Sequence, residues 1–428
     1  MFINNSISAT EGTDHRPALA RVCMVVFSYY PQDPRVYREA TALRRAGYEV
    51  DVFCLRQTPG TDCEDHEGVR VYRIMVGPRD KESLVRYLYH TLVFTLLAIT
   101  RISQLARRRG YALYQVHNMP DFLVFSCAVG RLLGKPILLD LHDLSVELFE
   151  TKLSGRRQAL LLPLVVWQER LACRFADHLI TTSEGFRRQL IARGHPESKI
   201  TLVLNSADPL LFSYDETRRF EPLGDELRLL YHGTVARRFG LHEVIQAMPH
   251  LRSRYPRVSL DVFGKYDPAY QLELRALIEQ LNLKDQVRLG DWRTPRELQE
   301  IIRAAHVAVV PYLRDAFMDI AISTKTFEYA ASGLPVVASR LHAMTDIYSE
   351  DSVTYVEPGD SEALATAILA LAGDPARRAL QSRLAFEAQQ HLSGAVMADR
   401  YTALITSLVA RVPRQNPSVK SLGTGEAS

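Results

Sequence analysis

Residues 323–339 of the chain read Ser-Thr-Lys-Thr-Phe-Glu-Tyr-Ala-Ala-Ser-Gly-Leu-Pro-Val-Val-Ala-Ser. The segment starts with Ser323 and Thr324, and either hydroxyl can accept a hydrogen bond from the free amides of a first helical turn. Gly333 stands where helices commonly end in the left-handed conformation, and Pro335 prevents the helix from continuing. The apolar run that follows is typical of a buried strand. The stretch therefore predicts a short helix that leads directly into a strand.

Two charged residues lie inside this predicted helix. Lys325 and Glu328 are three residues apart and therefore share one helical face. The free amides of a helix N-terminus and a nearby lysine can bind phosphate, whereas a carboxylate can accept hydrogen bonds from two ribose hydroxyl groups. The combination suits a phosphorylated sugar nucleotide, with Ser323 and Thr324 at the phosphate end of the helix.

Strands and helices alternate along the rest of the chain. Residues 22–27 and 49–54 are apolar runs, and 35–46 has the spacing of an amphipathic helix, so the three segments predict a β-α-β unit. Further strands are predicted at 113–116, 136–140, 178–182, 200–204, 228–232, 259–263, 286–289, 306–311 and 352–356. Further helices are predicted near 121–133, 158–175, 184–193, 268–281 and 295–304, another from about residue 240, and two more after residue 356. The pattern predicts an α/β fold with two doubly wound, Rossmann-like parallel sheets and a ligand site at the carboxyl ends of the strands, in a cleft between two domains.

Changes in composition predict the domain boundaries. Residues 1–20 are predicted to be a disordered lead, and 213–226 form a polar stretch expected to link the domains. The predicted order is a first domain at 21–212, a second domain at 227–394, a terminal helix at 395–412 that crosses back to the first domain, and a disordered tail at 413–428.

Composition limits the classes of protein to consider. Among the 428 residues, 47% are hydrophobic and 24% are charged, as in soluble globular proteins. The net charge of +3 is too balanced to indicate nucleic-acid binding, and no zinc-finger or RNA-binding motif occurs. The five cysteines are scattered and form no C-x-x-C pair, which favours reduced thiols and a cytoplasmic protein. The first twenty residues lack the apolar core of a signal peptide.

The segment F-E-Y-A-A-S-G-L-P-V-V-A at residues 327–338 resembles the nucleotide-sugar signature of the family 4 glycosyltransferases (GT4). This retaining family has the GT-B fold, with two Rossmann-like domains. The resemblance implies that Glu328 binds the ribose of the donor nucleotide. Many members carry another glutamate eight residues earlier, where this chain has Ile320 beside Asp319. The chain is similar to the subgroup with a short S/P-x-K-x-x-E-Y signature.

The segment His-Gly-Thr-Val-Ala-Arg-Arg-Phe-Gly at residues 232–240 resembles the family's strand–G-R-L-x-x-x-K-G–helix element, whose arginine and lysine bind the diphosphate. Thr234 and Phe239 occupy those two positions here, and Arg237 and Arg238 are displaced by a residue or two. Either arginine could fork onto phosphate oxygens, and the alternative is a solvated basic loop. The remaining candidates for donor binding are Gly233, Lys265 and Lys325. The alternative for Lys325 is a surface lysine paired with Glu328 or solvent.

Residues 138–143, Leu-Leu-Asp-Leu-His-Asp, are similar to the family's D-x-H element at the sugar end of the cleft. The resemblance places Asp140 and His142 there, with His142 able to hydrogen-bond the donor sugar near the reacting centre. The alternative is a structural histidine, and Glu147 is expected to orient this loop. His117 ends the preceding predicted strand and is expected to face the same cleft.

Two further positions complete the first-domain candidates. Arg35 starts the first predicted helix and could approach the acceptor or the donor phosphate. The alternative is a pairing of Arg35 with Asp33 or Glu39. Asn205 matches a family segment that is expected to shape the turn between the domains.

Two apolar stretches, 84–109 and 160–167, are too short in their uninterrupted parts to span a bilayer. They are either core helices or interfacial helices that touch the inner leaflet of the membrane. The basic run Arg107–Arg109 beside the first stretch favours the membrane.

Glycosyl transfer needs positive charge to stabilise the departing nucleoside diphosphate, and fixed cations and helix amides can supply it without a metal. No persuasive D-x-D motif or metal-ligand spacing occurs, so no metal and no other cofactor is predicted. The chain is predicted to be a retaining hexosyl- or N-acetylhexosaminyltransferase in cell-surface polysaccharide synthesis. Its donor would be a UDP- or GDP-type nucleotide sugar, its acceptor a glycan or lipid-linked glycan, and its place the cytoplasmic face of the plasma membrane.

Two other functions stay open. One is a GT-B nucleotide-sugar epimerase, for which the obvious carboxylates are Asp319, Asp140 and Asp143. The other is a non-catalytic partner that binds a nucleotide sugar. A nicotinamide dehydrogenase is disfavoured because no G-x-G-x-x-G follows a predicted strand.

Overall fold

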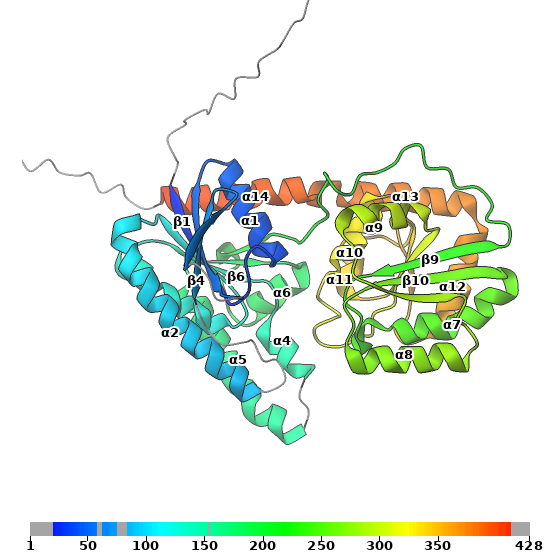
Figure 1. Cartoon of the computed structure of the whole chain (residues 1–428), viewed down its shortest axis with the longest axis horizontal. Helices are drawn as coiled ribbons and strands as arrows, with labels where there is room; N and C mark the ends of the chain where they lie inside the picture. The colour runs from blue at the N-terminus through cyan, green and yellow to red at the C-terminus, as the bar shows by residue number, and fades with distance from the viewer. Residues whose placement is uncertain (1–19, 58–61, 75–83, 153–154, 412–428) are drawn as a thin grey trace, which may run out of the picture. The chain divides into compact units, whose positions relative to one another are not determined.

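The computed structural model describes residues 20–57, 62–74, 84–152 and 155–411 (Figure 1). The predicted tail at 413–428 and all of the predicted lead except Ala20 therefore lie outside the described residues. None of the described helices combines the length and the apolar character that a bilayer span requires.

The first sheet has eight strands in the order β3-β4-β2-β1-β5-β6-β7-β8. The strands are β1 (Arg21–Val26), β2 (Glu49–Leu55), β3 (Cys63–His66), β4 (Val69–Ile74), β5 (Leu113–His117), β6 (Ile137–Leu141), β7 (His178–Thr181) and β8 (Ile200–Leu202). The helices in this part of the sequence are α1 (Pro34–Arg45), α2 (Leu84–Arg109), α3 (Ala128–Leu132), α4 (Ser145–Glu150), α5 (Gly155–Phe175) and α6 (Glu184–Ala192).

The prediction for this sheet was incomplete at its edge. β3 and β4 were missed, and β3 pairs antiparallel with β4, so the sheet is not wholly parallel. Strand β3 consists of Cys-Glu-Asp-His and has no apolar periodicity to reveal it. The helix predicted near 121–133 is instead a 3₁₀ segment, η1 (Asp121–Cys127), followed by the short α3.

The second sheet has six strands in the order β11-β10-β9-β12-β13-β14, and its strand pairs are parallel. The strands are β9 (Glu226–His232), β10 (Arg257–Gly264), β11 (Val287–Asp291), β12 (Val307–Val310), β13 (Val336–Ser339) and β14 (Thr354–Val356). The helices are α7 (Leu241–Arg254), α8 (Pro268–Gln280), α9 (Pro295–Ala304), α10 (Thr324–Ala331), α11 (His342–Thr345), α12 (Ser361–Gly373), α13 (Pro375–Gln389) and α14 (Gly394–Ala410). Three helices longer than a turn therefore follow β14, where two were expected.

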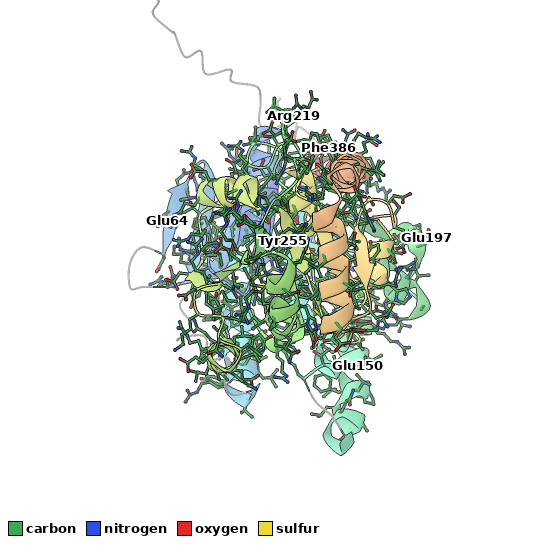
Figure 2. All side chains as sticks on the ribbon, turned by 90° about the vertical axis from the view of Figure 1, so that its right-hand side faces the viewer. Glu64, Glu150, Glu197, Arg219, Tyr255 and Phe386 are labelled. Atoms are coloured by element: carbon green, nitrogen blue, oxygen red, sulfur yellow. The ribbon has the colours of Figure 1, made fainter. Side chains whose placement is uncertain are left out.

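Central strands of both sheets are apolar because helices cover the two faces of a parallel sheet. All four residues of β12 and all four of β13 are buried. Tyr255, at the end of α7, is 2% exposed and lies among the side chains that fill this part of the molecule (Figure 2). The sequence therefore builds a rigid sheet whose strand ends can hold functional side chains in place.

The described residues form two compact units, one within residues 20–115, 126–136 and 406–411, and one within 116–125 and 137–405. The end of α14 belongs to the first unit, where the Thr406 hydroxyl lies 2.8 Å from the Tyr48 hydroxyl. The predicted domain boundaries stay a prediction.

Candidate active site

Two glycines bring the loop after β9 onto the end of β10. Gly233 follows β9 with φ of 113°, and its amide donates to Phe263 O at 2.8 Å. A Cβ added to Gly264 would lie 1.7 Å from Gly233 O. Only glycine fits at both positions, because one needs positive φ and the other a close backbone approach. The loop 233–240 is thereby fixed at the carboxyl edge of the second sheet.

Helix α10 begins beside this loop without a side-chain cap. Ser323 is the N-cap residue, but its hydroxyl forms no capping hydrogen bond and lies 3.0 Å from the Tyr312 hydroxyl. The prediction that Ser323 caps the helix was therefore wrong, because Tyr312 competes for the hydroxyl. Thr324 is exposed and is the first helical residue rather than the cap. The helix ends as expected, with Gly333 at φ of 66°.

Lys325 is a buried cation beneath the loop. Its side chain donates a hydrogen bond to the Tyr312 hydroxyl and lies 4.8 Å from the ring centroids of Tyr231 and Tyr312 and 5.3 Å from that of Phe239. A Cβ added to Gly233 would lie 2.9 Å from Lys325 Cε. Aromatic faces attract a cation electrostatically, so they hold Lys325 here. The surface-lysine alternative is wrong, since Lys325 is only 9% exposed.

Glu328 lies beside a histidine that the sequence analysis had left without a role. Its Oε2 atom is 3.1 Å from Nε2 of His232, the last residue of β9. The His232 amide donates to the Tyr329 hydroxyl at 3.0 Å, which fixes the strand end against α10. Burial, aided by the positive charge of Lys325, lowers the pKa of His232 to about 3. His232 is therefore a neutral imidazole beside the carboxylate. The position of His232 directly before Gly233 is the sequence signal that could have identified it as a site residue.

The other predicted donor-binding cations have partners of their own. Arg238 Nη2 donates to both carboxylate oxygens of Asp315, at 2.8 and 3.0 Å, and Arg237 pairs with Glu273. Lys265 is exposed, and its carbonyl accepts from the Val235 amide. The structure thus brings Lys325, Gly233 and Glu328 together. A phosphate would have to compete with Asp315 or Glu273 for either arginine.

His142 is held in a network at the end of β6. Asn205 Nδ2 donates to His142 Nε2 at 2.6 Å, and Asn118 Oδ1 accepts from the His142 amide at 3.0 Å. The Thr182 hydroxyl donates to the His142 carbonyl at 2.8 Å. Asn205 was expected only to shape a turn, but it also contacts the predicted catalytic histidine.

A cluster of buried carboxylates lies next to Asn118 in the same unit. Asn118 Nδ2 donates to Asp121 Oδ1 at 2.9 Å. Nearby, Arg193 pairs with both oxygens of Glu169, at 2.7 and 2.9 Å, and with Glu147. Burial raises the pKa of Glu169 to about 7 and also raises the pKa of Asp121 and of Glu147. The sequence analysis named only Glu147, because its partners come from α5 and from the residue after α6.

The remaining predicted cleft residues do not present free side chains at a surface. His117 and Asp140 are 0% and 1% exposed and form a pair of 2.9 Å, so the expectation that they face a cleft was wrong. Arg35 forms a forked pair with Asp33 at 2.8 and 2.9 Å. Asp33 also caps α1, which explains the pairing.

Two family models match the chain. Residues 32–206 match the glycosyl transferase 4-like domain, and residues 226–374 match the glycosyl transferases group 1. D-inositol 3-phosphate glycosyltransferase of Corynebacterium urealyticum is 30% identical over 407 residues, which cover 90% of this chain and 92% of the relative. The chain belongs to the GT4-type glycosyltransferases.

Solved structures confirm the GT-B fold of this glycosyltransferase. Sucrose-phosphate synthase of Thermosynechococcus elongatus superposes with a TM-score of 0.72 at 22% identity, covering 92% of this chain and all of that one. HepE of Anabaena, in complex with UDP-glucose, gives a TM-score of 0.66 at 17% identity and covers 91% of this glycosyltransferase and 100% of HepE.

Proposed function

We propose that this glycosyltransferase transfers a hexosyl or N-acetylhexosaminyl group, with retention, from a UDP- or GDP-type nucleotide sugar. The acceptor would be a glycan or lipid-linked glycan in cell-surface polysaccharide synthesis. The single observation that carries the proposal is the arrangement of Glu328, His232 and Lys325 beside the loop that begins at Gly233. It puts a carboxylate, a buried cation and an uncapped helix start at one sheet edge.

Each group of this arrangement matches one part of a nucleotide sugar. Glu328 would accept hydrogen bonds from the ribose hydroxyl groups, since its carboxylate is partly exposed and its histidine neighbour is neutral. Lys325 and the first amides of α10 would stabilise the diphosphate, whose negative charge grows as the glycosidic bond breaks. A solved neighbour, HepE, binds UDP-glucose, which supports a donor of this class.

His142 is the proposed catalytic residue of the first half. The hydrogen bonds to its ring, amide and carbonyl restrict its position at the end of β6. We assign it contact with the donor sugar, while the leaving phosphate takes the proton from the acceptor hydroxyl. This front-face route needs neither a carboxylate nucleophile nor a metal.

The exposed face of α2 supports the proposed membrane contact. Five of its large apolar side chains are 46–77% exposed, namely Val85, Leu88, Tyr89, Leu92 and Leu96. Every charged residue of α2 is an arginine. An interfacial helix buries its apolar side chains at the acyl boundary while its cations attract anionic lipids. On α5, Leu160, Leu164 and Trp167 are also exposed. We therefore place the enzyme on the cytoplasmic face of the plasma membrane.

A nucleotide-release assay tests the proposal. The full chain would be incubated in EDTA with UDP-, GDP-, ADP- and dTDP-sugars, with and without membrane lipid extract. Lipid-dependent release from one donor, together with a glycosylated lipid product of retained anomeric configuration, is the expected result. His142→Ala should abolish most release, and Glu300→Ala, an exposed glutamate on α9, should leave it unchanged.

Other results would assign the other functions. Conversion of the donor to a free epimer would establish the epimerase. Thermal stabilisation by a nucleotide sugar without release, across a panel of lipid and glycan acceptors, would establish the binding partner. Activity that requires a divalent metal would contradict the metal-independent route.

A further inference from the structure

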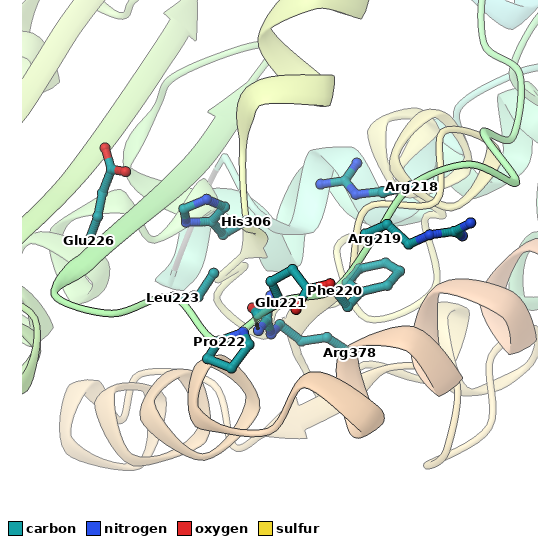
Figure 3. A pocket seen from close by; sticks show the side chains of 9 residues that line it. All are labelled: Arg218, Arg219, Phe220, Glu221, Pro222, Leu223, Glu226, His306 and Arg378. Carbon is teal, nitrogen blue, oxygen red and sulfur yellow. Dashed lines mark hydrogen bonds between the residues drawn. The ribbon is translucent and has the colours of Figure 1, made fainter.

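Polar side chains gather at two places outside the arrangement proposed to bind the nucleotide. One is a pocket of about 260 Å³ at the amino-terminal edge of the second sheet (Figure 3). Its arginines, Arg218 and Arg378, lie on either side of the Phe220 ring, and Glu221 and Glu226 line the same space. A small ligand could not contact both arginines at once. The other place is the set of strand ends around His142, where the polar groups converge on one residue.

Three residues reach His142 from the carboxyl ends of neighbouring strands. His142 is the first residue after β6. Asn118 is the first residue after β5, Thr182 is the first after β7, and Asn205 follows β8. These strands are neighbours in the sheet order β5-β6-β7-β8, and all four residues belong to one compact unit. Residues far apart in the sequence are thereby brought to one edge of the sheet.

The side-chain amide of Asn118 holds the turn that carries His142. Its Oδ1 atom accepts from the His142 amide at 3.0 Å, and the Asp143 amide lies 3.5 Å from the same oxygen. Its Nδ2 atom donates to the Asp143 carbonyl at 2.6 Å and to Asp121 Oδ1 at 2.9 Å. The oxygen and both hydrogens of the amide nitrogen are therefore used. The side chain continues the pairing that the Asn118 backbone amide makes with Asp140 O at 3.0 Å.

The chemistry of the partners fixes the orientation of this amide. A backbone N–H can only donate, and a backbone carbonyl can only accept. The oxygen of Asn118 must therefore face the His142 amide, and its nitrogen must face the Asp143 carbonyl. If the amide turned over, its oxygen would meet that carbonyl and the Asp121 carboxylate. One orientation satisfies the partners, so the main chain of His142 has a defined anchor.

Burial makes this anchor rigid. Asn118 is 1% exposed and Asp121 is 0% exposed. Hydrogen bonds are stronger in such surroundings than in water, and a buried polar group that loses its partner is costly. Without the Asn118 amide, the His142 N–H, the Asp143 carbonyl and the Asp121 carboxylate would each lose this partner. The turn would rearrange to recover hydrogen bonds and would move His142.

Thr182 supports the other side of the same residue. Its hydroxyl donates to the His142 carbonyl at 2.8 Å, and the residue is 6% exposed. Asn118 thus holds the N–H of His142 and Thr182 holds its C=O. Asn205 lies at the imidazole, 2.6 Å from Nε2. Main chain and ring therefore have separate supports, as a side chain that must be held in a narrow range of positions requires.

We propose that Asn118 is a positioning residue for sugar transfer, which acts through the main chain of His142 with Thr182 as a second support. The inference rests on the proposed contact between His142 and the donor sugar. Asn118 itself would touch neither donor nor acceptor. A displacement of His142 by about 1 Å should lower turnover on the order of a hundredfold. The contacts that Glu328 and Lys325 would make with the nucleotide should stay, so the donor KM should change little.

A double-mutant cycle of nucleotide release tests this inference. The full chain would be assayed with the same UDP-, GDP-, ADP- and dTDP-sugars and lipid extract as above. Asn118→Ala should lower kcat on the order of a hundredfold and change the donor KM by less than about twofold. Because Asn118 would act through His142, adding Asn118→Ala to His142→Ala should cause no further fall. Two reductions that multiplied in the double variant would overturn the proposal.

Thr182→Val is a milder second variant that keeps the inference testable if Asn118→Ala does not fold. It removes the hydroxyl that donates to His142 O and should lower kcat by about five- to tenfold, again with no effect in the His142→Ala background. Thr201→Val is the matched control, because its hydroxyl lies 2.8 Å from Nε2 of His178, the first residue of β7. It should leave kcat unchanged. Equal losses in the two threonine variants would overturn the proposal.

Amide hydrogen exchange gives a readout that does not depend on activity. In Asn118→Ala the amides of His142 and Asp143 should exchange on the order of tenfold faster, because they lose their acceptor, while those of β11 should not change. Unchanged protection at residues 142–143, or unchanged kcat in an active enzyme, would overturn this inference alone. A wild type that releases no nucleotide from any donor would instead overturn the proposed function, and the role of Asn118 with it.

Discussion

At the scale of single residues, Glu328 and His232 form the contact that we propose as the basis of donor recognition. Glu328→Ala should weaken donor binding by roughly 2–4 kcal/mol, because two ribose hydroxyl groups lose a charged acceptor. Calorimetric titration with the donor's nucleotide measures this loss. A nucleotide with a 2′,3′-dideoxyribose sharpens the test, because it should bind wild type and variant equally well. A full penalty for the variant with this analogue as well would refute the ribose assignment.

His232 supports a separate prediction about the same contact. His232→Ala should raise the donor KM by about five- to tenfold with a smaller change in kcat, since Glu328 loses a neighbour that orients it. His232→Gln, which can donate to Glu328, should restore most of the KM. With the pKa of His232 at about 3, the wild-type donor KM should show no inflection from this group between pH 5 and 8. An inflection near pH 6.5 that disappears in His232→Gln would contradict a neutral imidazole.

At the scale of elements, α4, α5 and the segment after α6 meet in the buried carboxylate cluster. The pKa of Glu169 is about 7 in the folded chain and near 4.5 when unfolded, so the folded state binds more protons between these values. Stability should therefore fall as pH rises through this window, by on the order of 1–2 kcal/mol. The same sign holds for Asp121 and Glu147, whose pKa values are also raised.

Glu169→Gln tests this dependence, because the amide cannot ionise. The unfolding temperature of the wild type should drop more between pH 5.5 and 8 than that of the variant. Glu197→Gln changes an exposed glutamate, 67% accessible and paired with Arg187, and should leave the wild-type slope intact. If the unfolding temperature of Glu169→Gln changed with pH as steeply as that of the wild type, Glu169 would have to stay ionised throughout this pH range.

The sequence predicted secondary-structure elements well where the residues that start and end an element lie within the element itself. The helix starting at Thr324, its end at Gly333 and the following strand were confirmed. The cap at Ser323 failed because its competitor, Tyr312, sits on another segment. His232 escaped notice for the same reason, since its partner is on α10. Such contacts depend on how strands are ordered in the sheet, which periodicity along the chain does not specify.

At the scale of the whole molecule, membrane attachment is the property to measure. Leu92→Glu combined with Leu96→Glu should reduce co-sedimentation with phosphatidylglycerol vesicles severalfold, because two exposed apolar contacts on α2 become charged. Leu272→Glu, on α8 and 70% exposed, is the matched control and should bind vesicles normally. Equal binding to phosphatidylcholine vesicles would contradict the role of the arginines.

The short hairpin of β3 and β4 has a consequence for how the protein behaves in solution. β3 is four residues long, and its Glu64 and Asp65 place acidic groups along the outer margin of the first sheet. A strand from another molecule that tried to extend this sheet would find few free backbone groups and no apolar face to cover. The opposite margin, β8, is three residues long. Both margins of the first sheet therefore discourage edge-to-edge aggregation between molecules.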